Sequence, residues 1–119
     1  MVAFNFKAQF ADDVEHGIKR QTIRTNRRCR AGDALQLYTG MRTRKCRKLR
    51  DAVCTMVQEV SIAVHGQFVA VRLDGELLPS VLARQLAQAD GFDGVSSFAE
   101  FFEHEYGGLP FQGWLIKWE

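Results

Sequence analysis

The segment KRQTIR, residues 19–24, places an amine, a hydroxyl and two guanidinium groups close together. If RQTIR is a strand, Arg20, Thr22 and Arg24 share one face, and Lys19, just before it, can reach back over Thr22. Neighbouring cations lower the pKa of a lysine, and a neutral amine beside a hydroxyl is the Ser–Lys type of activated nucleophile, here with threonine. The spacing is therefore compatible with nucleophilic attack, with Arg24 available to stabilise an oxyanion.

Such chemistry also needs a group that transfers protons, and Asp90 is the candidate. It precedes Gly91 at the expected end of a helix, where a carboxylate can point into a cleft. A purely structural interpretation is equally compatible with the spacing: a solvated lysine and arginines, a threonine that favours strands, and an aspartate in a turn. Spacing alone leaves both interpretations open.

Aromatic and basic residues later in the chain suggest contacts with a nucleotide. Tyr38 could stack on a base and Arg42 could contact a phosphate. The alternative is an ordinary aromatic residue at a strand end, followed by a surface arginine. Trp114 and Trp118 share a face of the last expected strand, where they belong to the core or line a pocket.

The charge distribution along the chain is uneven, although the net charge is only +2. The stretch Lys19–Arg50 holds twelve Lys or Arg and one acid, Asp33, whereas the rest of the chain holds four cations and thirteen acids. A concentrated positive surface attracts phosphates, so this stretch predicts RNA as a possible partner. A solvated basic turn is the alternative for its most charged part, RTRKCRKLR.

The elements that must position these residues follow from periodicity and turn signals. Six strands are expected at 2–10, 21–25, 34–40, 52–64, 67–73 and 111–119, and helices at 10–17, 77–92 and 96–107. Residues 41–50 have no usable period and are expected to form a basic loop or hairpin tip. This order favours one α+β domain over residues 1–119, with a curved or barrel-like, mostly antiparallel sheet.

Several classes of protein are disfavoured by what the sequence lacks. No apolar run is long enough to span a bilayer and no signal-peptide pattern is present, which predicts no membrane association and a cytoplasmic location. Three cysteines without a CxxC pair and three scattered histidines give no disulfide framework and no predicted metal site. No phosphate-binding loop or dinucleotide fingerprint occurs, so no cofactor is predicted. The oligomeric state is not predicted.

The sequences FADDVEHGIKRQTIR and AGDALQLYTGMR together resemble the ASCH domain, a member of the PUA-like superfamily. The shared pattern is a short helix, G-x-K-x-x-T-I-R and then G-D-x-L, here Gly17, Lys19, Thr22, Ile23, Arg24, Gly32, Asp33 and Leu35. The late ADGF followed by an aromatic helix and a closing strand is also similar. The resemblance is dense from Phe10 to Arg42 and thin from Arg44 to Leu77.

The resemblance implies a small open β-barrel with helices at its rim and a cleft beside the K-x-x-T-I-R strand. Some small bacterial members are amidohydrolases that remove the acyl group from N4-acetylcytidine, with a lysine and threonine of this block and a later glutamate as their catalytic set. On this chain these become Lys19, Thr22 and Asp90, an acid one methylene shorter, with Asp93 and Glu100 as the fallback acids.

The sequence thus leads to three expected functions. The first is hydrolysis of the acyl group of an N4-acylated cytidine nucleoside or nucleotide by Lys19, Thr22 and Asp90, with Arg24, Tyr38 and Arg42 contacting the substrate. The second is an RNA-binding module without catalysis. The third is a ribonuclease in which Lys19 and Arg24 face the scissile phosphate.

Overall fold

The computed structural model describes residues 1–119 and contains seven strands and three helices, which confirms the predicted α+β class. In chain order these are β1 (Val2–Phe6), α1 (Ala8–Glu15), β2 (Gln21–Arg24), β3 (Ala34–Thr39), β4 (Arg47–His65), β5 (Phe68–Leu73), β6 (Glu76–Leu77), α2 (Ser80–Ala89), α3 (Val95–Glu105) and β7 (Phe111–Trp118). The strand beyond the expected six is β6, which has only two residues. None of the three helices has the length and hydrophobicity needed to cross a membrane.

The sheet is mixed and open. Its strand order is β1-β3-β4-β5-β6, and β7 pairs with both β4 and β2. The β1–β3 pair is parallel and all other pairs are antiparallel. Because β1, β2 and β6 each pair with one strand only, the sheet does not close into a ring.

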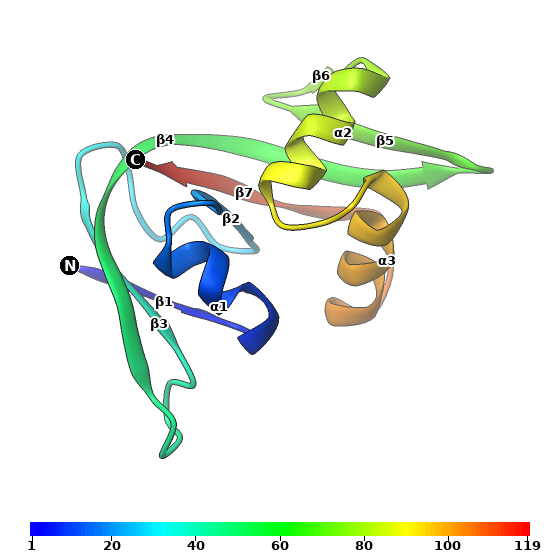
Figure 1. The fold of residues 1–119 in the computed structure, drawn as a ribbon. Coiled ribbons are helices and arrows are strands. Elements are labelled where there is room, and N and C mark those ends of the chain that lie inside the picture. The colour runs from blue at the N-terminus through cyan, green and yellow to red at the C-terminus, as the bar shows by residue number, and fades with distance from the viewer.

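Strand β4 joins the two parts of the sheet (Figure 1). Its first residues pair with β3, its middle pairs with β7 after an irregularity between Cys54 and Met56, and its end forms the expected hairpin with β5. The strand begins at Arg47, five residues earlier than predicted, so residues 47–50 are not loop. Their backbone is held in the β3–β4 ladder, which local sequence does not reveal.

Two buried clusters fill the space between sheet and helices. The first contains Phe4, Phe6, Phe10, Val14, Leu35, Leu37, Ile116 and Trp118, and the second contains Ile23, Ile62, Phe98, Phe102, Phe111 and Leu115. Alternate residues of β7 enter different clusters, because neighbouring side chains of a strand point to opposite faces. Trp118 is core, and Trp114 is partly buried under the guanidinium of Arg27, 5.5 Å from its ring centre.

Two glycine-ended helices bring the candidate residues together. Helix α1 is followed by Gly17 with φ +73°, and the backbone N–H groups of Ile18 and Lys19 both donate to the Asp13 carbonyl, which turns the chain into β2. Helix α2 is followed by Asp90 and by Gly91 with φ +103°. Positive φ favours glycine, so each glycine allows a sharp turn beside the site.

Candidate functional site

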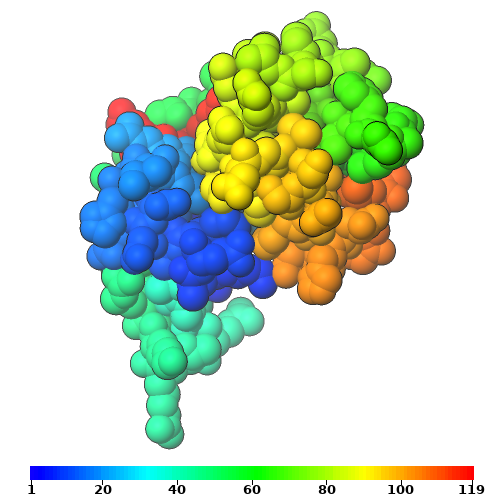
Figure 2. Space-filling model, turned by 45° about the vertical axis from the view of Figure 1, so that its right-hand side comes forward, coloured from blue at the N-terminus to red at the C-terminus, as the bar shows by residue number.

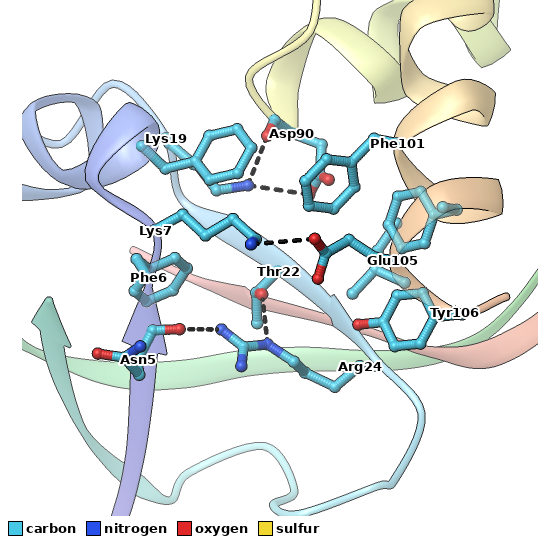
Figure 3. A pocket seen from close by; sticks show the side chains of 13 residues that line it. Asn5, Phe6, Lys7, Lys19, Thr22, Arg24, Asp90, Phe101, Glu105 and Tyr106 are labelled. Atoms are coloured by element: carbon cyan, nitrogen blue, oxygen red, sulfur yellow. Dashed lines mark hydrogen bonds and ion pairs between the residues drawn. The ribbon is translucent and has the colours of Figure 1, made fainter. Parts of the chain in front are cut away.

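A cleft of about 120 Å³ lies where β1, α1, β2, α3 and the residue after α2 meet. Its lining includes Lys19, Thr22, Arg24 and Asp90, which come from two segments of the chain, as well as aromatic rings of α1 and α3. Figure 3 shows their side chains directed toward one another across this space. The cleft therefore contains the predicted catalytic set.

Lys19 and Asp90 form a buried ion pair. Lys19 Nζ lies 3.1 Å from Asp90 Oδ1 and also donates to the Asp90 backbone carbonyl, and each side chain is about 5% exposed or less. Burial lowers the pKa of Lys19, against the opposing effect of Asp90, and Arg24 lowers it further. The direction matches the sequence prediction, but burial is the main cause, and Arg20 takes no part because it is exposed and donates to the Gly17 carbonyl.

The pKa of the Asp90 carboxyl is shifted in the opposite direction, upward. Burial raises its pKa, while the charge of Lys19 and a hydrogen bond from Gln21 oppose that rise. Both groups of the pair are thus pushed toward their neutral forms by the same loss of solvent. A proton can therefore move from Lys19 to Asp90 at a smaller cost than it would have in water.

Thr22 and Arg24 form the second pair of the cleft. Arg24 Nε donates to Thr22 Oγ1 at 2.9 Å, and its Nη2 donates to the Asn5 carbonyl at 2.8 Å. The rings of Phe4 and Phe6 flank the guanidinium, whose centre lies 5.1 and 5.2 Å from theirs. Partial burial lowers the pKa of Arg24, which keeps its cation beside the hydroxyl at the edge of the core.

The expected contact between Lys19 and Thr22 is indirect. Both side chains line the same cleft, but no hydrogen bond joins them. The lysine amine is instead directed toward Asp90 and lies 4.8 Å from the ring centre of Phe10. Proton transfer between the amine and the hydroxyl would therefore need a bridging water molecule or substrate atom.

Four polar residues of the site were not identified from the sequence. Lys7 and Glu105 form an ion pair of 3.0 Å across the cleft, and the hydroxyl of Tyr106 points into it (Figure 3). Gln21, expected to face away with Ile23, is buried and donates to Asp90. No local pattern indicates these contacts, because each joins positions far apart in the chain.

The other predicted residues lie elsewhere. Tyr38 is on β3, where its hydroxyl is 3.5 Å from Gln36 Oε1, and Arg42 is exposed in the following turn with φ +66°. Neither lines the cleft. The fallback acids Asp93 and Glu100 are exposed and also lie outside it.

The basic stretch divides into an interior and an exterior part. Lys19 and Arg24 belong to the cleft, whereas Arg42, Arg44 and Lys45 are exposed at the turn between β3 and β4. This turn forms the tip of a narrow projection, in teal at the bottom of Figure 2. Just beyond the tip, Arg47 pairs with Glu15 and Lys48 with Asp51.

The chain brings together no group of three or more His, Cys, Asp or Glu side chains with metal-binding geometry. Comparison with protein-family models, with curated proteins and with solved structures gave no match.

Proposed function

We propose that this protein is an amidohydrolase that removes the acyl group from N4-acylated cytidine or a related modified nucleoside. The observation that supports this most is that Lys19, Thr22, Arg24 and Asp90 line a single cleft as two hydrogen-bonded pairs. An amine, a hydroxyl, a cation and a carboxyl are the groups that nucleophilic hydrolysis of an amide needs.

In the proposed reaction, Lys19 first passes a proton to Asp90, which leaves a neutral amine beside a neutral acid. The amine then takes the proton of the Thr22 hydroxyl through a bridging water or substrate atom. Thr22 Oγ1 attacks the acyl carbon, and negative charge develops on the carbonyl oxygen. Arg24 stabilises this oxyanion, a contribution of about 3 kcal/mol for one such donor.

Asp90 next gives its proton to the exocyclic nitrogen as the C–N bond breaks, which releases cytidine and restores the ion pair. Water then hydrolyses the acyl-threonine ester, releases the carboxylic acid and regenerates Thr22. A second route uses the same proton transfers but has Thr22 only position the attacking water. Mass spectrometry after rapid quenching distinguishes the routes, because only the first adds an acyl group to Thr22.

The test is incubation of the EDTA-treated protein with N4-acetylcytidine while cytidine release is followed by chromatography. We expect turnover by the wild type, loss of turnover in Lys19→Ala, and wild-type turnover in Lys45→Ala, which removes an exposed lysine outside the cleft. No turnover by the wild type, or equal turnover by Lys19→Ala, would contradict the proposal.

We also infer that the fold is of the PUA-like, ASCH type. The residues that carry the resemblance have matching structural places: Gly17 follows a short helix, residues 21–24 form β2, and Gly32 and Asp33 precede β3. The bent β4 gives the open sheet the curvature of an incomplete barrel (Figure 1). An experimental structure in which β1 and β2 lie in separate flat sheets would contradict this inference.

An RNA-binding module is the second candidate function. Its support is the projecting turn, where Arg42, Arg44 and Lys45 have no carboxylate within ion-pair distance. Affinity for an RNA oligonucleotide would then fall steeply with salt, since phosphate contacts release counterions. Hydrolysis of a neutral nucleoside would respond much less. No binding at low salt would exclude this function.

A further inference from the structure

Gln21 is a buried polar residue whose amide spans two elements of the fold. Its Nε2 lies 3.2 Å from Asp90 Oδ1 and 3.4 Å from the backbone carbonyl oxygen of Leu86. Only 5% of the residue is exposed. A glutamine amide buried in this way is stable only with partners, and both partners belong to the last turn of α2 or the residue that follows it.

The two contacts fix the end of α2 against β2. The Leu86 carbonyl that accepts from Gln21 also accepts from the backbone N–H of Asp90, at 3.0 Å. Gln21 therefore holds both the carboxylate and the helical turn that carries it. Lys19 provides the other polar link between these segments, from the opposite side of the same oxygen.

The carboxylate of Asp90 is bound asymmetrically as a result. Oδ1 accepts from Lys19 and from Gln21, whereas Oδ2 accepts no hydrogen bond from the protein. Asp90 lines the cleft, and Oδ2 is its carboxylate oxygen without a protein donor. Without Gln21, rotation about χ2 of Asp90 could exchange its two oxygens or turn the carboxylate away from Lys19.

We propose that Gln21 is a positioning residue that holds Asp90 Oδ1 beside Lys19 Nζ, so that the carboxyl keeps one orientation while it receives the lysine proton and passes it to the leaving nitrogen. The contact stands on the geometry alone, and only its catalytic use rests on the proposed function. Gln21 itself touches no substrate in this role.

The same hydrogen bond favours the ionised form of Asp90. The charged or titratable groups around this carboxyl are Lys19 and Arg24 on the β2 side and Tyr106 at the end of α3; Asp13 of α1 acts on it only through Lys19. Gln21 is the neutral donor among them, so its removal leaves every charge in place. A change in the Asp90 titration would then report the lost hydrogen bond.

The test uses ¹³C NMR titration of the aspartate side chains, with the Asp90 signal identified from Asp90→Asn. Gln21→Met keeps the length of the side chain and removes the amide, and Gln85→Met is the control on the exposed face of α2. We expect the Asp90 pKa to rise in Gln21→Met and to stay unchanged in Gln85→Met. If Gln21→Met does not fold, Gln21→Leu, which also removes the donor without adding a charge, is expected to raise the pKa as well.

Activity provides the second readout. We expect kcat of the Gln21 variant to fall by about tenfold with KM little changed, because a misplaced proton donor affects the transition state rather than binding. An unchanged Asp90 titration would overturn the positioning role, whatever the activity. If the Asp90 titration shifts in the Gln21 variant but the wild type shows no turnover, the positioning contact is supported and the proposed function is rejected.

Discussion

Arg24 Nε donates a hydrogen bond to Thr22 Oγ1 at 2.9 Å, so the threonine oxygen is an acceptor beside a fixed cation. The two residues are two positions apart on β2 and therefore share a face. The hydroxyl proton of Thr22 is left to be donated elsewhere, and the adjacent positive charge favours an alkoxide over a hydroxyl.

Replacing Thr22 by valine tests this relationship, because the side chains have nearly the same shape. We expect kcat on N4-acetylcytidine to fall at least about 100-fold, since the nucleophile or its positioning group is lost. Arg24 Nε would lose its acceptor, and the free energy of unfolding would fall by about 1–3 kcal/mol. Thr22→Ser, which keeps the hydroxyl, should retain activity. Equal activity of the valine variant would rule out a role for Oγ1.

The buried ion pair predicts that the free energy of unfolding depends strongly on whether one partner or both are replaced. Lys19→Met leaves the Asp90 carboxylate buried without its cation, and we expect unfolding free energy at pH 7 to fall by about 3–5 kcal/mol. The double variant Lys19→Met/Asp90→Asn leaves no buried charge and should be more stable than Lys19→Met. Chemical denaturation measures both values. A double variant less stable than the single one would contradict the ion pair.

For the same variants, we predict how the stability of the folded protein changes with pH. Without Lys19, the pKa of Asp90 in the folded protein rises further above its ordinary value of 3.8. The folded state then holds a proton that the unfolded state has lost, so stability of Lys19→Met falls as pH rises from about 4 to 7. Denaturation at several pH values should show a steeper decline than in the wild type, and Asp90→Asn should abolish the difference.

Local periodicity was enough to predict the α+β class and most of the elements. The positions of Lys19, Thr22 and Asp90 could be predicted because each lies beside a turn or on a short strand that the sequence marks clearly. Arg20 was misplaced, because the alternation was extended through it, whereas β2 begins at Gln21 and Arg20 remains outside the strand. Extending the pattern by one residue was sufficient to assign Arg20 the wrong environment.

The remaining contacts depend on tertiary packing that no local pattern records. Gln21 reaches Asp90, 69 positions away, only because the end of α2 approaches β2. The pairing of Lys7 with Glu105 likewise depends on how α3 lies beside α1. The early start of β4 reflects its pairing with β3, which overrides the weak strand preference of a basic segment.

Gly91 is predicted to be intolerant of any side chain. Its φ is +103°, and an added Cβ would lie 2.9 Å from a ring carbon of Phe10, a residue that lines the cleft. Gly91→Ala should therefore lower both thermal stability and turnover. The control is Gly94→Ala, where the backbone is extended and no atom lies within 4 Å of the added carbon. Equal melting temperatures for the two variants would contradict this account.

The three cysteines should differ sharply in reactivity. Burial, reinforced by Cys54, raises the pKa of Cys29 to about 12, and the two sulfur atoms lie 3.9 Å apart inside the protein. Thiolates are the reactive form, so the native protein should react quickly with a thiol reagent at pH 8 only at the exposed Cys46. Cys46→Ser should abolish the fast phase. If two or more thiols of each native wild-type molecule react in the fast phase, Cys29 and Cys54 are not both buried.

The Lys7–Glu105 ion pair crosses the cleft and connects the residue before α1 with the end of α3 (Figure 3). Both side chains are partly exposed, so breaking the pair should change stability by less than about 1 kcal/mol. We infer that a substrate reaching Thr22 displaces this pair, because both of its residues line the same cleft. We therefore expect Glu105→Gln to lower KM severalfold while leaving the melting temperature nearly unchanged.

Salt provides an independent check of the same contact, because it screens exposed ion pairs. Raising the ionic strength should lower the wild-type KM for a neutral nucleoside and have little effect on Glu105→Gln. Lys48→Ala, which breaks the exposed pair with Asp51 outside the cleft, should behave as the wild type. If KM instead rises in Glu105→Gln, the carboxylate of Glu105 binds the substrate directly, and the ion pair is not what limits entry to the cleft.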